Sequence, residues 1–216
     1  MATTIINRYR PVVQPRLPAA PNEYTAEFIE QYSNILRLYF NQLDNLTGAL
    51  LGESGGRFIR FPYGAFSSDQ DQTAIANTAT LMTLNTTDFA NEVSIATSKI
   101  TVANSGIYNL QFSVQLENSN NAPQDVFIWL KQNGTDIVGS TGKIGMPARK
   151  NPSDPFHSIV GWNYYLEMDA SDYVEIYWST TSADVSIQFY AASASPTKPA
   201  TQSVVATLSF VSALST

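Results

Sequence analysis

The only histidine of this 216-residue chain, His157, lies next to Ser158 and three residues after Asp154. These are the residue types of a catalytic triad, in which histidine takes a proton from serine while aspartate orients the imidazole ring. In an extended chain, however, adjacent side chains point in opposite directions, and the sequence around the serine lacks the pattern of a nucleophile elbow. We therefore expect His157 to be a structural or surface residue, and we expect the protein not to be an enzyme.

Two pairs of carboxylates, Asp69 with Asp71 and Asp169 with Asp172, have the close spacing of calcium-binding loops. Carboxylate oxygens are the ligands that Ca²⁺ prefers, but aspartates in short loops also form turns and caps. The absence of cysteine excludes disulfides and thiolate metal sites, and a single histidine excludes a two-histidine zinc site. We expect turn-forming aspartates and no cofactor.

Charged residues make up only 14 % of the chain, and its net charge is −6. Surface polarity comes instead from serine, threonine, asparagine and glutamine, which together supply about a third of the residues. An acidic, lysine-poor chain without a phosphate-binding loop is a poor candidate for nucleic-acid binding. No apolar run approaches the ~18 residues of a membrane span, and residues 1–8 lack the pattern of a signal peptide. We expect a scaffold or binding protein that contacts neither nucleic acid nor membrane and is not exported.

Residues 1–21 contain three arginines, four prolines and no acidic residue. Proline at this density prevents a helix and favours an extended, polyproline-like backbone. Such a segment is either a disordered tail or an arm that lies on another surface, and we interpret it as an anchoring arm. The residues expected to anchor it are Arg8, Arg10, Pro11, Arg16 and Pro18.

Residues 22–50 are predicted to form one long α-helix, capped by Asn22 and followed by a glycine-rich hinge over residues 51–57. One apolar stripe of this helix consists of Phe28, Tyr32, Ile35, Tyr39 and Leu46, with Gln42 filling the gap. A second stripe, at heptad spacing, consists of Ile29, Leu36, Leu43 and Leu50. A helix that is apolar on two sides must be covered on two sides, either within its own chain or by a symmetry-related copy.

From Phe58 onward the hydrophobic pattern has a period of two, most clearly over Ile107–Glu117. Val126–Leu130 is apolar on both faces and is followed by Asn133-Gly134, a strong two-residue hairpin signal. Further strand-like runs are Tyr164–Met168, Tyr173–Trp178, Val185–Tyr190 and Val204–Val211. Many short strands at this spacing predict an all-β head, a β-sandwich or jelly roll, over residues 58–216.

The longest segment without a strand pattern is Thr141–Pro155, and it is locally basic because of Lys143, Arg149 and Lys150. In an acidic head, these residues mark either a recognition loop or an ordinary solvated connection.

The stretch Ile100–Val114, with Gly106 before Ile107-Tyr108, resembles the "apxxGxYxFxF" region of tumour-necrosis-factor-like and complement-type globular heads. The Asn133-Gly134 hairpin and Tyr165–Ile176 follow in the order of that family, and the resemblance covers roughly Tyr63 to Leu214. It implies a jelly roll and a compact homotrimer. Under this resemblance the outward aromatic residues Phe127, Trp129 and Tyr177 are candidates for trimer contacts, and the alternative is that they belong to the sandwich core.

The segment Pro15–Tyr24 and the helix around Leu36–Asp44 resemble the N-terminal segments of small virion proteins from tailed phages of marine bacteria, such as cyanophages. In those proteins an N-terminal arm and helix tether a C-terminal β head to the particle.

The expected function is therefore that of a non-enzymatic virion structural protein, assembled in the bacterial cytoplasm and contacting other capsid, neck or tail proteins. It would act as a trimeric capsid decoration, fibre, knob or tail-associated component. The alternative is a receptor-binding head that grips a host-surface glycan or protein. A cell-surface or spore-coat trimer of the same fold is a third class, against which the missing collagen-like stalk argues.

Overall fold

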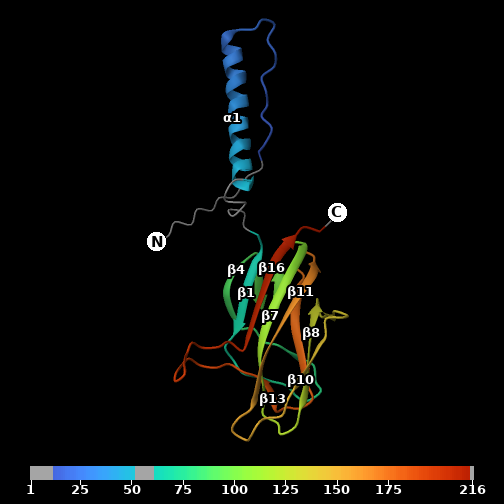
Figure 1. The fold of residues 1–216 in the computed structure, drawn as a ribbon. Coiled ribbons are helices and arrows are strands. Elements are labelled where there is room, and N and C mark those ends of the chain that lie inside the picture. The colour runs from blue at the N-terminus through green and yellow to red at the C-terminus, as the bar shows by residue number, and fades with distance from the viewer. Residues whose placement is uncertain (1–11, 52–60, 215–216) are drawn as a thin grey trace. The chain divides into compact units, whose positions relative to one another are not determined.

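The computed structural model describes residues 12–51 and 61–214. The chain divides into two compact units, Met1–Arg60 and Phe61–Thr216, and each is described by itself. The first unit holds the helix α1 (Ala26–Leu51), and the second holds all the strands formed by the described residues (Figure 1). Apart from Leu51, the predicted glycine-rich hinge lies outside the described residues.

The helix α1 begins where Thr25 caps it. The Oγ1 atom of Thr25 accepts a hydrogen bond from the backbone N–H of Phe28 at 3.2 Å, which satisfies one of the free N–H groups of the first turn. Glu27 lies in that turn, where a negative charge complements the helix dipole. The prediction that Asn22 caps the helix was therefore wrong, because Thr25 supplies the cap and the helix starts four residues later.

The second unit, the head, is a sandwich of two antiparallel sheets. Sheet A contains, in hydrogen-bonded order, β4 (Thr86–Asn91), β1 (Tyr63–Ser68), β16 (Val204–Ser212), β7 (Gly106–Asn118) and β11 (Phe156–Met168). Two short strands extend it: β13 (Val185–Ile187) pairs with the end of β7, and β2 (Gln72–Thr73) pairs with β13.

Sheet B contains, in hydrogen-bonded order, β10 (Gly142–Met146), β8 (Gln124–Gln132), β12 (Tyr173–Thr180), β6 (Lys99–Val102) and β5 (Val93–Ala96). The short strand β9 (Thr135–Asp136) pairs with β8, and β3 (Thr80–Leu81) pairs with β12. A separate small hairpin consists of β14 (Ser193–Ala194) and β15 (Thr197–Lys198).

The connectivity of the eight main strands is that of a jelly roll. In chain order these strands are β1, β6, β7, β8, β10, β11, β12 and β16. The first pairs with the last, the second with the seventh, the third with the sixth and the fourth with the fifth. This is a long antiparallel ribbon folded over into two sheets. The prediction of a jelly-roll sandwich preceded by one long helix is confirmed.

The core lies between the sheets and follows the predicted alternation. Along β7 the even-numbered side chains from Tyr108 to Leu116 are buried, while Gln111 on the other face is exposed. Trp178, Phe66 and Tyr108 are the largest fully buried side chains. The hairpin predicted at Asn133-Gly134 also forms, since both residues have positive φ (51° and 80°) and join β8 to β9 in a two-residue turn.

The two ends of the head differ. At one end, the base, the strand β1 begins beside the end of β16, and the N–H of Phe210 donates to the carbonyl oxygen of Pro62 at 2.9 Å. The opposite end, the tip, carries the loops that follow β7, β10 and β12, at residues 119–123, 147–155 and 181–184 (Figure 1). The chain therefore enters and leaves the head at the base, while these three loops lie at the tip.

Candidate functional site

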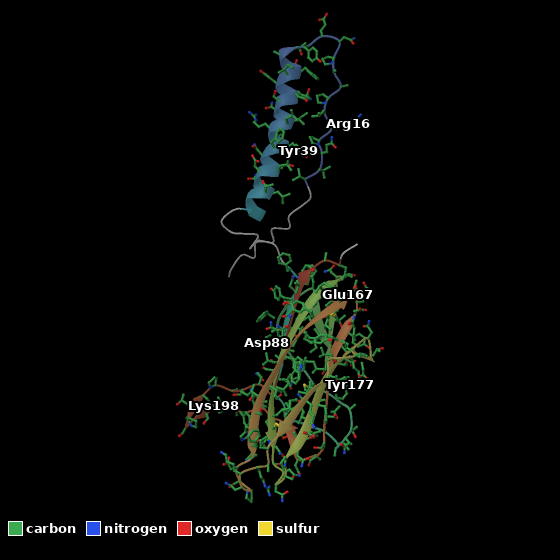
Figure 2. All side chains as sticks on the ribbon, turned by 45° about the vertical axis from the view of Figure 1, so that its right-hand side comes forward. Arg16, Tyr39, Asp88, Glu167, Tyr177 and Lys198 are labelled. Carbon is green, nitrogen blue, oxygen red and sulfur yellow. The ribbon has the colours of Figure 1, made fainter. Side chains whose placement is uncertain are left out.

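The described part of the arm, residues 12–21, runs alongside α1 in the opposite direction, and residues 22–25 connect it to the helix (Figures 1 and 2). Along this segment Val12, Pro15, Pro18 and Pro21 are half-buried, whereas the residues between them are exposed. A polyproline II helix has three residues per turn, so every third side chain lies on the same side. The arm therefore packs one edge of its extended backbone against α1, and we call residues 12–51 the arm–helix hairpin.

The predicted anchoring residues fall into two groups. Pro18 is one of the half-buried residues of the arm, and Arg16 is exposed, as Figure 2 shows. Arg8, Arg10 and Pro11 lie outside the described residues.

The first apolar stripe of α1 lies under the arm. Its five residues are all half-buried, namely Phe28, Tyr32, Ile35, Tyr39 and Leu46. The ring of Phe28 stacks on Tyr32 at 6.3 Å and meets Tyr24 edge-on at 5.8 Å. Within the first unit, this stripe therefore packs against the chain's own arm.

The second stripe is only partly covered, and the side chain of its last residue, Leu50, lies outside what the structure describes. Leu36 and Leu43 are half-buried, but Ile29 is 48 % exposed and the neighbouring Phe40 is 56 % exposed. At 100° per residue these four side chains fall within a sector of about 60° on α1. The first unit thus presents a narrow apolar face that its own arm leaves open.

The three aromatic residues predicted as trimer contacts lie on the outer face of sheet B. Phe127, Trp129 and Tyr177 are half-buried, while the alternate residues Ile128 and Trp178 fill the core. Their outward orientation follows from the strand alternation, and the alternative that they belong to the core was wrong.

These aromatic side chains are held by cross-strand contacts. The rings of Trp129 and Tyr177 lie 5.9 Å apart, and Nζ of Lys131 lies 4.5 Å from the centroid of Tyr177. The Nε1 atom of Trp129 donates to Oδ1 of Asp136 at 2.7 Å. The outer face of sheet B is therefore an ordered surface of rings, amines and carboxylates.

The predicted basic loop is partly a strand. Lys143 lies in β10, with its Nζ 2.8 Å from Oδ2 of Asp125 and 5.7 Å from the centroid of Phe127. Residues 147–155 form the true loop, where Nζ of Lys150 lies 3.5 Å from Oδ2 of Asp154. Arg149 is half-buried, and its N–H donates to the carbonyl of Asn120. The prediction of a continuous loop over residues 141–155 was wrong at its start because residues 142–146 pair with β8.

The residues of the imagined triad do not come together. On β11 the exposed His157 and the half-buried Ser158 alternate between the two faces, and Asp154 pairs with Lys150. Instead, Nδ1 of His157 lies 3.0 Å from the hydroxyl of Tyr190 and 3.6 Å from Oε2 of Glu117. Burial, together with the negative charge and hydrogen bond of Glu117, raises the pKa of Tyr190 to about 12.

The two aspartate pairs serve as turn and loop anchors. Asp69 accepts from Asn85, and Asp71 accepts from the backbone N–H of Phe189. Asp172 accepts from Asn133, Gln132 and the N–H of Asp169. Over residues 12–51 and 61–214, no group of three or more histidine or acidic residues is arranged to hold a metal ion.

The structure also contains a hollow that the sequence did not reveal. It has a volume of about 680 Å³ and lies at the tip, where β8 and β10 meet the turn after β12. Pro123, Gln124 and Asp125 line one side, and Gly145, Met146 and Pro147 line the other. No signal in the sequence pointed to it, because residues 141–155 were predicted as one loop and Gly145 was not assigned to a strand.

In the part of the chain that the structure describes, α1 is not apolar enough to cross a membrane, and no other helix is present.

Comparison with known proteins gives no family for this chain. No protein-family model and no curated protein matches the sequence.

Proposed function

We propose that this chain is a non-enzymatic structural protein of a tailed-phage virion, in which residues 1–50 attach the protein to the particle and the jelly-roll head is displayed. The observation that carries the proposal is the separation of base and tip in the head. The chain enters β1 and leaves β16 at the base, and the loops 119–123, 147–155 and 181–184 lie at the opposite end. A head held at its base leaves these loops free for solvent or a partner.

The arm–helix hairpin supplies the attachment surface in this proposal. Its open apolar face contains Ile29 and Phe40, and an exposed apolar patch on a soluble unit is typical of an interaction site. None of the four charged residues of α1 lies within this face: Asp44 and Arg37 flank it on the side of Phe40, and Glu30 and Glu27 lie farther round the helix.

We also propose that three copies associate through this face. Ile29, Leu36 and Leu43 repeat every seven residues, and a strict seven-residue repeat keeps one face in register only when helices supercoil around one another. The arm occupies the adjacent stripe, so each copy brings its own polyproline cover to the outside of the bundle. On the head, the outer-face residues Phe127, Trp129 and Tyr177 remain candidates for contacts between copies.

The attachment role is tested by deleting residues 1–21. Particles are assembled in the host with either the full chain or the truncated chain, and the copy number per particle is measured by quantitative mass spectrometry. We expect the truncated protein to stay folded, because the head has its own core, and to be absent from purified particles. A matched control replaces residues 1–21 with a glycine–serine segment of the same length, which preserves chain length but removes the prolines and arginines.

Two results would contradict the proposal. Normal incorporation of the truncated chain would show that the arm does not attach the protein. Absence of the full-length protein from all purified particles would show that it is not a virion component.

A second candidate function is recognition of a host-surface glycan by the head, and the hollow at the tip favours it. Ligand sites are usually concave, with apolar walls and a few polar groups that set orientation, and volumes of about 300–1,000 Å³ are typical. The tip hollow has these properties and lies at the end of the head away from the base.

A further inference from the structure

Gly145 lines the hollow at the tip and faces outward from β10. Gly145 pairs with Asp125 of β8, and an added Cβ at Gly145 would have no protein atom within 4 Å. The preceding outward residue of β10 is Lys143, whose side chain extends over Phe127. A Cβ at position 145 would therefore project into open space, and a longer side chain would extend from there into the hollow.

A fully buried amide holds the walls of the hollow in place. Nδ2 of Asn118, a residue with 0 % exposure, donates to the carbonyl of Pro147 at 2.8 Å and lies 3.3 Å from the carbonyl oxygen of Ala122. This side chain joins the loop after β7 to the loop after β10. A site whose walls are ordered in advance loses less entropy on binding.

A second network fixes the polar rim. The N–H of Asp125 donates to Oγ1 of Thr181 at 3.0 Å, and that hydroxyl donates to Oε1 of Gln124 at 2.7 Å. Thr181 is exposed, and Gln124 and Asp125 are half-buried, so their remaining hydrogen-bonding capacity faces solvent.

The charges lining the hollow are already compensated. Asp125 is the carboxylate of the lining, and its Oδ2 lies 2.8 Å from Nζ of Lys143. A phosphate or acidic ligand would compete with Asp125 for the lysine, and a cation would compete with Lys143 for the carboxylate. The carboxylate, held by the lysine, instead remains an acceptor for the hydroxyl groups of a neutral molecule.

The rest of the lining is apolar or small. Met146 borders the hollow but its fully buried side chain faces the core, and the apolar surface offered to a ligand is that of the exposed Pro123 and Pro147. Apolar walls with a few convergent donors and acceptors suit a ligand that has both C–H faces and several hydroxyl groups. A sugar ring has this combination.

We infer that the hollow between Gly145 and Asp125 binds a neutral, polyhydroxylated sugar unit, an inference that rests on the proposed glycan-binding role of the head. Asp125 and Thr181 hydrogen-bond to hydroxyl groups, Lys143 positions the carboxylate of Asp125 from beside the hollow, and Pro123 and Pro147 contact the C–H face of the ring. Gly145 sets the size of the site because its missing side chain creates the space.

The test is saturation-transfer NMR with the full chain against glucose, galactose, N-acetylglucosamine and rhamnose, with galacturonate as the charged counterpart. We expect at least one neutral sugar to give a saturable signal and galacturonate to give none. Gly145→Gln fills the hollow and should weaken binding of that sugar by about tenfold or more. Ser94→Gln introduces the same side chain at an exposed position of β5, at the far edge of sheet B, and should leave binding unchanged.

The outcomes separate the two levels of the proposal. Binding that Gly145→Gln leaves intact would overturn the site while leaving the glycan-binding role. Binding of none of the four neutral sugars would overturn both, and preference for galacturonate would overturn the neutral ligand class. Asp125→Asn, which keeps the shape of the hollow but breaks the ion pair with Lys143, should also weaken binding, and no effect would contradict the assigned role of Asp125.

Discussion

The indole ring of Trp162 on β11 occupies the space that a side chain at Gly142 on β10 would need. The ring of Phe112 on β7 stacks against the same indole, with centroids 5.7 Å apart and planes 4° from parallel. Since β11 belongs to sheet A and β10 to sheet B, this stack closes one edge of the sandwich.

We predict that Gly142→Ala destabilises the head by about 2 kcal/mol, because overpacking a filled site forces side chains or backbone to shift. Gly145→Ala is the matched control on the same strand, where nothing lies within 4 Å of the added Cβ. It should leave the free energy of unfolding within about 0.5 kcal/mol of the parent. Urea unfolding monitored by tryptophan fluorescence checks both values, and equal stabilities of the two variants would refute the Trp162 contact.

The open face of α1 predicts an effect on oligomeric state. Phe40 and Leu38 are similarly exposed, at 56 % and 61 %, but they lie on nearly opposite sides of the helix. Phe40→Asp should shift the full chain from the proposed trimer to a monomer in size-exclusion chromatography with light scattering, because a charge would be buried in the proposed helix interface. Leu38→Asp should leave the mass unchanged, and dissociation by both variants alike would argue against a specific face.

Packing of the arm on α1 predicts protection from trypsin at Arg16. Tyr39 lies in the half-buried stripe under the arm, so Tyr39→Ala should loosen the arm and speed cleavage after Arg16 several-fold. Leu38→Ala changes an exposed neighbour and should not. Mass spectrometry of the released N-terminal peptide follows the cleavage, and an unchanged rate in Tyr39→Ala would contradict the arm–helix hairpin.

The carboxyl group of Asp172 predicts a pH dependence of head stability. Burial acts to raise its pKa, but hydrogen bonds from the N–H of Asp169 and from Asn133 and Gln132 outweigh it, so the net pKa lies below 3.8. A carboxyl whose pKa is lower in the folded state stabilises the fold at neutral pH, and this contribution is lost as the pH falls through about 4 and below.

Asp172→Asn should therefore be less stable than the parent at pH 7, and the difference should shrink towards pH 3. Unfolding free energies measured by urea denaturation across that range check the sign. If the difference in unfolding free energy between the variant and the parent stayed constant with pH, the three donors would not be stabilising the ionised carboxylate.

The sequence predicted the parts of the fold in which one face is buried. The alternation over Ile107–Glu117 requires a half-buried strand, and Asn133-Gly134 requires a tight hairpin because both residues tolerate positive φ. The strand β10 was missed because its two glycines, Gly142 and Gly145, have low strand propensity. Glycine occupies these two positions because of contacts in the folded protein: Gly142 makes room for Trp162, and Gly145 leaves the tip hollow open.

The arm was also predicted only in part from the sequence. Its prolines predicted an extended backbone, and their spacing of three residues is visible in the sequence at Pro15, Pro18 and Pro21. The surface on which the arm lies could not be predicted, because the stripe of α1 that it covers was equally suited to packing with another copy. The choice between these two surfaces depends on the three-dimensional arrangement of the folded unit, which the local sequence pattern does not contain.

The central claim, attachment through the N-terminal unit, is tested most directly by site-specific photocrosslinking within assembled particles. A photoreactive amino acid replaces Arg16 on the arm or, as the control, Val138 on the head, which is 96 % exposed. We predict that position 16 crosslinks to another virion protein and that position 138 does not. Crosslinks to virion proteins from position 138 alone would contradict attachment through the arm.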